Sequence, residues 1–152
     1  MRTIDGNGGV FGQNGLGGGE DGMYLEDLTG HTVIQNGIIR NCHVENLGDP
    51  LTSYSTKNGD CGQLERTKPG PLSLFIEDTY LGGASDSCWD VKGSSSHPVV
   101  AFFRNVTFGP AHRALRVWEN ATVYHQSCTW LPGSNHNIWK QDASAKVIEL
   151  PS

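Results

Sequence analysis

The stretch from Trp89 to Trp130, WDVKGSSSHPVVAFFRNVTFGPAHRALRVWENATVYHQSCTW, contains one short pattern twice. Phe103–Phe108 (FRNVTF) and His125–Trp130 (HQSCTW) each combine a strand-like segment, a polar corner and a large closing residue. Two earlier segments fit the same pattern, Ile39–Val44 (IRNCHV) and Phe75–Tyr80 (FIEDTY). The closing residues of the four copies lie 36, 28 and 22 residues apart, as expected for a 22-residue repeat with two insertions. Repeats of this length without a helical pattern predict a stack of coils built from strands.

Polar residues occupy the corner of each copy, where asparagine suits a sharp bend because it tolerates a left-handed backbone. The aligned corner residues are Asn41, Glu77, Asn105 and Ser127. The closing residues are expected to point into the core and the polar residue before each of them outward, because side chains alternate along a strand. The first residues of the copies form another inward column, which predicts that His125 is a core histidine.

These features resemble the right-handed parallel β-helix of pectate lyases, polygalacturonases and phage tailspikes, over roughly residues 22–150. The segment Thr3–Gly9 (TIDGNGG) resembles the IDGxG phrase near the start of such helices. Asp86–Lys92 (DSCWDVK) is similar to the DDGxDxK phrase that begins a coil in several of these enzymes, with Ser87 and Cys88 in place of the second aspartate and the glycine. The resemblance implies an all-β fold, a single-stranded, right-handed parallel β-helix (β-solenoid) of about five coils. It also implies a pectate-lyase-like protein whose partner is a polysaccharide.

Composition and charge limit the organisation and the partners. A chain of 152 residues suits a single domain, 1–152, and a formal net charge of −5 disfavours nucleic acid as a partner. We read the Gly-rich residues 1–22 as an irregular first coil or cap, and residues 45–70 as one long inserted loop. No apolar run approaches ~18 residues, which predicts no membrane span. The N-terminus shows no signal-peptide core, whereas the resemblance implies a secreted or cell-surface location.

The four cysteines have no CxxC or CxxH spacing, which disfavours a zinc site. Cys42 and Cys128 fall in one inward column and are expected to be buried thiols. They lie three coils apart, roughly 14 Å at strand spacing, which is too far for a disulfide. If any bridge forms, we expect it between Cys61 and Cys88.

The strands that open the coils predict a candidate binding surface. Residues 22–26, 88–92, 114–118 and 137–140 align, and aromatic and charged side chains alternate outward along them. Flat rings beside hydrogen-bonding charges suit a sugar, and in the β-helix enzymes that the chain resembles the polysaccharide lies on this sheet. The predicted substrate-binding residues are Tyr24, Glu26, Asp90, His112, Trp118 and Trp139. The alternative is a plain surface or a subunit interface, in which Asp90 and Arg116 pair between neighbouring coils.

Catalysis by β-elimination would need a base and a cation that acidifies the proton. Lys92 or Arg116 is the candidate base, provided that neighbours suppress its charge. Asp86 and Asp90 are the candidate Ca²⁺ ligands, although Ser87 removes one ligand of the lyase phrase and predicts weak binding of the metal. A hydrolase would need two facing carboxylates, and Asp86 with Asp90 is the only local pair.

The leading expectation is a protein that binds an acidic polysaccharide along this face and cleaves it as a lyase does. Three alternatives stay open: a non-catalytic glycan-binding module, an adhesion module and a structural spike segment. A homo-oligomer through coil ends or sides is a further expectation. An open end of the solenoid would expose unpaired strand edges, so either the tail caps it or it meets another subunit.

Overall fold

The computed structural model describes the chain at residues 2–5, 10–13, 24–27, 37–41, 43–46, 60–66, 73–84 and 86–152. Within these ranges, side chains are described at residues 40, 41, 43, 60–65, 73–84 and 86–152. The described segments consist of strands, turns and bends, and none of them is a helix. The predicted all-β class is therefore confirmed for the part of the chain that the structure describes.

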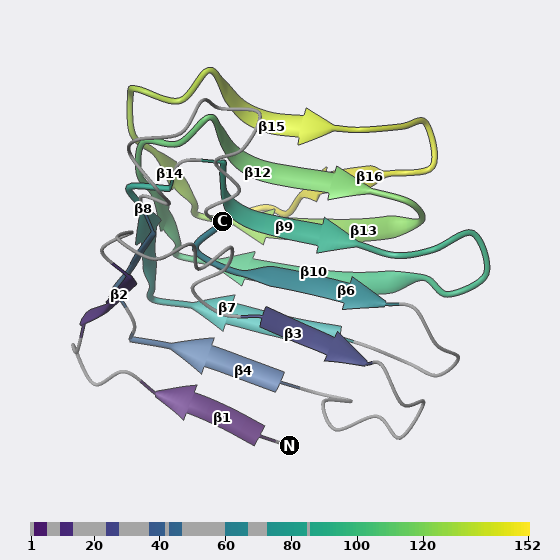
Figure 1. The fold of residues 1–152 in the computed structure, drawn as a ribbon, viewed down its shortest axis with the longest axis horizontal. Helices are drawn as coiled ribbons and strands as arrows, with labels where there is room; N and C mark the ends of the chain where they lie inside the picture. Colours follow the sequence, from purple (N-terminus) through teal and green to yellow (C-terminus); the bar gives the residue numbers. More distant parts are fainter. Residues whose placement is uncertain are drawn as a thin grey trace.

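Three parallel sheets form the sides of a solenoid (Figure 1). The first sheet contains β1 (Arg2–Asp5), β4 (Gly37–Arg40), β7 (Ser73–Glu77), β10 (Val99–Arg104), β13 (Ala121–Gln126) and β16 (Lys146–Glu149). The second sheet contains β2 (Val10–Gln13), β5 (His43–Asn46), β8 (Tyr80–Gly82), β11 (Thr107–Phe108) and β14 (Thr129–Trp130). The third sheet contains β3 (Tyr24–Asp27), β6 (Gln63–Arg66), β9 (Ser87–Lys92), β12 (Arg113–Trp118) and β15 (His136–Lys140). Each strand pairs with the strand three places further along the chain, for example β1 with β4 and β4 with β7, so each coil gives one strand to each sheet. The predicted parallel β-solenoid is therefore confirmed.

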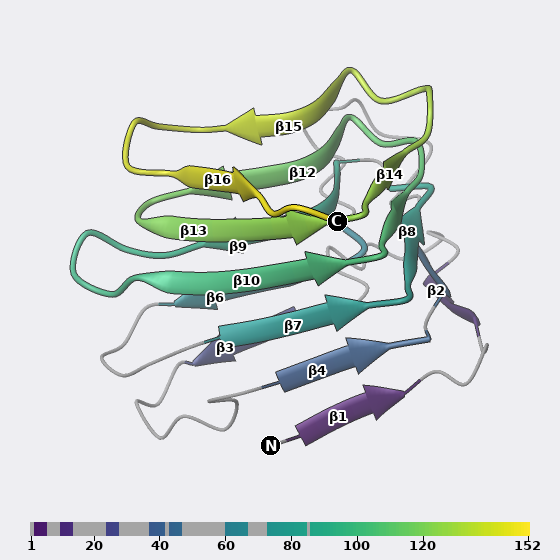
Figure 2. The same ribbon diagram turned by 180° about the vertical axis from the view of Figure 1, so that it is seen from behind.

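The described coils wind in the right-handed sense. In Figure 1 the strands β9, β12 and β15 lie in front and run from left to right, each above the one before. Figure 2 shows β10 and β13 from behind, where they again run from left to right and therefore in the opposite direction in space. A chain that circles in this way while climbing from N to C forms a right-handed coil, as expected.

The corners of the repeat are set by left-handed backbone conformations. Asn41, Asp78, Asn105 and Ser127 have φ angles of 52°, 49°, 54° and 52°. The side-chain amide of Asn105 also donates a hydrogen bond of 2.7 Å from Nδ2 to the carboxylate of Asp78 one coil below. Asparagine and aspartate tolerate this conformation because their short polar side chains bond locally. The prediction of Glu77 as a corner residue is wrong by one position.

The same shift of one residue reverses the predicted side of Tyr80. Leu81, and not Tyr80, pairs with Phe108 and is fully buried, while Tyr80 pairs with Thr107 on the outer surface. The Tyr80 ring lies flat across Gly82 and Gly109, where an added Cβ would come within 2.4 and 2.3 Å of its hydroxyl. Two glycines thus make room for an aromatic ring outside the sheet.

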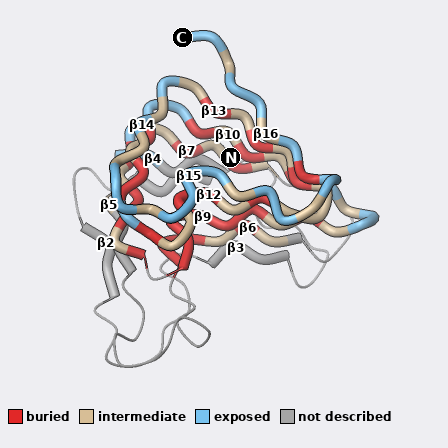
Figure 3. Tube along the Cα trace, turned by 90° about the horizontal axis from the view of Figure 1, so that it is seen from above, coloured by how far each residue is buried: buried red, intermediate tan, exposed pale blue. Residues whose placement is uncertain are grey.

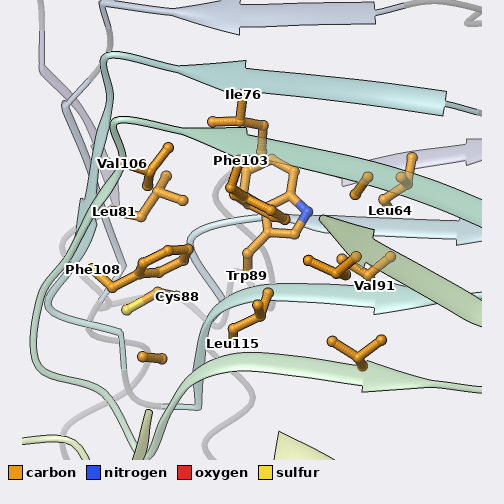
Figure 4. Close-up of a cluster of buried hydrophobic side chains, with 14 of the residues drawn as sticks. Leu64, Ile76, Leu81, Cys88, Trp89, Val91, Phe103, Val106, Phe108 and Leu115 are labelled. Carbon is orange, nitrogen blue, oxygen red and sulfur yellow. The ribbon is translucent and has the colours of Figure 1, made fainter. Parts of the chain in front are cut away.

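A continuous apolar core fills the solenoid, and Figure 4 shows its side chains converging from all three sheets. The ring of Trp89 meets that of Phe103 edge-on at 6.4 Å, and Phe103 meets Phe108 at 5.6 Å. The inward residues predicted on the third sheet, Trp89, Val91, Leu115 and Val117, are all fully buried. Ile138 is 37% exposed because it lies on β15, the last strand of that sheet.

His125 is a core histidine, as predicted. It is 7% exposed, pairs with Phe103 of the coil below, and meets the ring of Trp130 edge-on at 5.8 Å. Trp130 itself stacks on Phe108 at 4.4 Å and is only half-buried, because it lies on the last strand of the second sheet.

The predicted inserted loop at residues 45–70 is wrong at both ends. At its start, β5 continues to Asn46, and near its end the loop contains β6. Leu64 is fully buried and pairs with Val91, and Cys61 is buried in the same core, so these two inward residues hold this polar segment on the sheet. In the Gly-rich opening, β1 and β2 pair with β4 and β5 and form part of a coil.

The described cysteines are free thiols. Cys61 and Cys88 are buried, and they donate to the carbonyl oxygens of Gly82 and Gly109 at 3.2 and 3.3 Å. Cys128 is half-buried rather than fully buried, because it lies beside the last strand of the second sheet. Cys42 lies outside the described residues.

Candidate functional site

Two columns of residues run across the strands of the third sheet, and the described side chains in them point away from the core. The register of the sheet aligns the first column as Tyr24, Gln63, Asp90, Arg116 and Trp139. It aligns the second as Glu26, Glu65, Lys92 and Trp118. The predicted pairing of Asp90 with Arg116 across neighbouring coils is confirmed. The side chains of Tyr24 and Glu26 lie outside the described residues, although the backbone of β3 pairs with β6.

Asp90 is the anchor of the first column. Its side chain is fully buried although it lies on the outer side of the sheet. Arg116 donates to its Oδ2 from Nε at 3.0 Å and also from Nη2, and Trp118 donates from Nε1 to its Oδ1 at 2.7 Å. Burial raises the pKa of Asp90 above its ordinary value, although the hydrogen bonds from Arg116 and Trp118 act in the opposite direction. Two large side chains of the next coil therefore cover this carboxylate.

Two further buried carboxylates complete an aspartate–arginine cluster, which consists of Asp60, Asp86, Asp90, Arg113 and Arg116. Asp86 accepts from Arg113 Nη1 at 2.6 Å and from Arg116 Nη1 at 3.4 Å. Asp60 accepts from the backbone N–H of Ser87 at 2.7 Å and is fully buried. Burial, followed by the charges of Asp90 and Asp86, raises the pKa of Asp60 well above its ordinary value. The cluster thus holds three carboxylates in a desolvated place with two guanidinium groups.

The geometry gives no support to Lys92 or Arg116 as a general base. Lys92 Nζ lies 2.9 Å from Glu65 Oε1, and an ammonium in such an ion pair has no lone pair to accept a proton. Burial alone would lower the pKa of Arg116, but its hydrogen bond to Asp90 and the charges of Asp90, Asp86 and Asp60 raise it above its ordinary value. Both residues therefore serve better as cations than as bases.

The expected Ca²⁺ ligands do not fit a calcium site in this arrangement. Each carboxylate oxygen of Asp86 and Asp90 accepts a hydrogen bond from Arg113, Arg116 or Trp118. Calcium takes six to eight oxygen ligands, and the guanidinium groups would repel it. Within the described ranges, no three His, Cys, Asp or Glu side chains come together as a metal site. Asp86 and Asp90 are also the two carboxylates that a hydrolase would need, and these hydrogen bonds already engage both of them.

A second group of polar rings lies where β12 and β15 begin. Asn135 Nδ2 lies 2.9 Å from His112 Nδ1, and the rings of His112 and His136 meet edge-on at 6.3 Å. The ring of His136 lies 4.5 Å from that of Trp139, and the guanidinium of Arg113 lies 5.7 Å from the same indole. Burial, followed by the charge of Arg113, lowers the pKa of His112 below its ordinary value. The predicted residues His112 and Trp139 therefore belong to one group.

The charges on this face are arranged in two layers. The side chains of Lys92, Arg113 and Arg116 are 24%, 15% and 15% exposed, whereas those of Asp86 and Asp90 are 5% and 0% exposed. Trp118 and Trp139 are half-buried, and Figure 3 shows the change from the mostly buried β9 to the mostly exposed β15. Lys92 Nζ and the Arg116 guanidinium lie 4.3 and 4.8 Å from the Trp118 ring. Three cations and two indoles thus meet the solvent above the aspartates, and the one carboxylate described among them, Glu65 at 14% exposed, is paired with Lys92.

Sequence reasoning missed Asp60, Gln63 and Glu65, since it placed all three in a loop. The segment Gln63–Arg66 (QLER) shares a polar–leucine–acid pattern with Tyr24–Asp27 (YLED), and this pattern could have identified the strand. Gln63 donates to Glu65 at 2.7 Å, which holds Glu65 for its ion pair with Lys92.

Comparison with known proteins gives no relative: no protein-family model, no curated protein and no solved structure matches the chain. The described residues also include no helix that is long and apolar enough to cross a membrane.

Replacing Asp60 with asparagine is expected to raise the melting temperature at neutral pH. Because the pKa of Asp60 is higher in the folded protein than in the unfolded chain, its contribution to stability is full below about pH 3.8 and is lost as the pH rises through the folded pKa. Asparagine keeps an acceptor for the Ser87 N–H and has no charge to desolvate. We expect a gain of about 2–4 °C at pH 7, and little gain near pH 4, in thermal unfolding followed by circular dichroism.

The matched control is Glu149→Gln, which removes an exposed carboxylate on β16 and should leave the melting temperature nearly unchanged. A lower melting temperature for Asp60→Asn at pH 7 would contradict this prediction, because it would show that Asp60 is needed as an anion beside Arg116.

Proposed function

We propose that the outer face of β9, β12 and β15 binds an acidic polysaccharide, and that the protein is a glycan-binding module rather than a lyase. The observation that carries the proposal is the layering of charge on this face. Lys92, Arg113 and Arg116 are partly exposed beside the indoles of Trp118 and Trp139, while the aspartates that hold the arginines lie beneath them.

An acidic sugar offers the groups that this layer can receive. The apolar face of a sugar ring packs on an indole, and its hydroxyl rim is left free for hydrogen bonds. Its carboxylate matches a guanidinium, which presents paired N–H donors in a fixed plane. Arg116 is held by two aspartates, so it loses little side-chain entropy when a ligand binds. Trp118 is held in the same way by Asp90.

Binding without β-elimination is favoured over cleavage by the engagement of the candidate catalytic groups. Lys92 is in an ion pair, the pKa of Arg116 is raised, and the oxygens of Asp86 and Asp90 all accept hydrogen bonds. The spike-segment alternative has no comparable observation in the described residues.

The proposal is tested by titrating the protein with polygalacturonate, dextran sulfate and neutral dextran, with calorimetry and tryptophan fluorescence as readouts. We expect binding of the two acidic polymers and no binding of dextran. Release of unsaturated product should be absent with Ca²⁺ and with chelator alike. No binding of either acidic polymer would overturn the proposal. Turnover that is lost in Lys92→Ala would restore the lyase hypothesis, and light scattering that shows a trimer with this face covered would favour the spike segment.

Trp118→Ala is expected to weaken the binding of polygalacturonate about three- to tenfold, because an aromatic stacking contact contributes about 0.5–1.5 kcal/mol. It should also lower stability modestly, because Trp118 covers Asp90 and donates to it. Calorimetric titration measures the first effect and urea unfolding the second.

Tyr124→Ala is the matched control for this prediction, because Tyr124 is a half-buried aromatic residue on the outer side of the first sheet. It stacks on Phe102 at 5.0 Å and belongs to the first sheet, whereas the proposed binding face belongs to the third sheet. Equal affinities for the Trp118 and Tyr124 variants would contradict the assignment of the binding face to the third sheet.

A further inference from the structure

Two imidazoles lie at one end of the proposed binding face, beside its cations. His112 and His136 occupy neighbouring coils, with their rings edge-on at 6.3 Å, and the backbone N–H of His136 donates to the carbonyl of His112 at 3.3 Å. His136 pairs in register with Arg113 and contacts the ring of Trp139. Any ligand that lies on Trp139 and Arg113 therefore passes both histidines.

We propose that His112 and His136 make this face acid-responsive, so that its affinity for an acidic polysaccharide rises as the pH falls from about 7.5 to about 5. The inference rests on the proposed glycan-binding function. It adds the condition under which that function is strongest.

The hydrogen bond between Asn135 and His112 has two forms, one for each charge state of the imidazole. With neutral His112, the amide N–H of Asn135 donates to Nδ1, as the 2.9 Å contact requires. With charged His112, Nδ1 carries a proton and the amide turns to offer its oxygen. Asn135 is exposed, so the turn disturbs no packing. The site can therefore hold His112 in either state.

The groups that face His112 set the pH range in which it gains its charge. Burial and the charges of Arg113, His136 and Arg116 oppose the charging of His112, and the charge of Asp86 favours it. Charging therefore takes place below the ordinary histidine pKa of about 6.5. A bound polyanion favours the charged imidazole in turn, because binding and protonation are linked.

The buried aspartates change the face in the same direction. The pKa values of Asp60 and Asp90 are raised, so acidification removes negative charge beside Arg116 at a higher pH than for an ordinary aspartate. Uronic acids keep their charge near pH 5, because carboxyl groups beside electronegative atoms ionise at about pH 3.3–3.7. The attraction therefore grows before the ligand loses its own charge.

The experiment compares dissociation constants for polygalacturonate at about pH 7.5 and about pH 5, at one ionic strength. We expect the native protein to bind about three- to tenfold more tightly at the lower pH, which corresponds to one or two added surface charge pairs. In the double variant His112→Gln/His136→Gln, the dissociation constants at the two pH values should be nearly equal. The control His97→Gln removes a histidine from the turn after β9, where it bonds Ser94, and should keep the full ratio.

A second measurement uses the native protein alone, so it does not depend on how the variants fold. NMR titration of the imidazoles should show the pKa of His112 moving upward when dextran sulfate is added. An equal affinity at both pH values, a double variant with the native ratio, or an unmoved His112 titration would each overturn the inference. Binding at neither pH would instead overturn the proposed function itself, so the two failures are distinguishable.

Discussion

Arg116→Ala is expected to lower the free energy of unfolding by about 3–5 kcal/mol at neutral pH, the range found when one partner of a buried ion pair is removed. Arg116 is bonded to Asp90, which is fully buried, and to Asp86, which is nearly so. Without the guanidinium, Asp90 keeps the N–H of Trp118 and Asp86 keeps Arg113. Two carboxylates then share a desolvated place with Asp60 and a single arginine. Urea unfolding of the native and variant proteins measures the loss.

The structure offers a matched control in Arg104→Ala. Arg104 also forms an ion pair with a carboxylate of the coil below, Glu77, but its side chain is 54% exposed. Exposed pairs contribute about 0–1 kcal/mol, so the control should lose little stability. Equal losses in the two variants would contradict the prediction, because the cost at Arg116 would then not arise from desolvated carboxylates.

Acidification should partly rescue Arg116→Ala. Removing the cation takes away the main interactions that lower the pKa of Asp90, so burial raises that pKa further. A carboxyl group with a raised folded pKa stabilises the fold below about pH 3.8 and loses this contribution as the pH rises through the folded pKa. The difference between native and variant should therefore be larger at pH 7 than at pH 4.5.

Repeat spacing was sufficient to predict the fold and one pair of the site. Aligning the strands that open the coils placed Arg116 directly above Asp90, and the register of β9 with β12 confirms it. The prediction worked here because polar and apolar residues alternate cleanly along both strands. The same alternation placed Trp89 and Leu115 in the core.

The alignment failed at β7 and β8 because aromatic residues lie on both sides of the first and second sheets. Phe75 stacks on Phe102 at 5.9 Å on the outer surface, so Phe75 is not a core residue. An alignment that is based on large apolar residues is therefore shifted by one residue in this segment. The corner is more reliable, because Asp78 must adopt a positive φ whatever lies on either side of the strand.

The burial of the aspartates in the site could not be predicted from the alternation of polar and apolar residues along the strands. Alternation states that Asp90 points away from the core, but not that Trp118 and Arg116 fold down over it. Asp60 reaches the same cluster from a segment in which only Cys61 and Leu64 are apolar residues buried in the core, which is a weak signal of the solenoid. Burial on the outer side of a sheet depends on side chains of the next coil, and these are known only once the register is known.

Phe103→Ala should lower the free energy of unfolding by about 3–5 kcal/mol, the range for removing a large aromatic side chain from a packed core. Phe103 is 1% exposed and lies between the rings of Trp89 and Phe108, which come from the third and second sheets. Removing its ring leaves a cavity where all three sheets meet. The fixed strands cannot close such a cavity, because each coil is hydrogen-bonded to those above and below it.

The adjacent residue supplies the comparison that decides this prediction. Phe102 is half-buried on the outer side of the same strand, where it stacks on Phe75 and Tyr124. Phe102→Ala should cost about 0.5–1.5 kcal/mol, since it loses ring stacking without opening a cavity in the core. Urea unfolding of both variants measures the two losses on one scale. If Phe102→Ala cost more than Phe103→Ala, the inner and outer sides of the first sheet would be reversed, and with them the register on which the binding face depends.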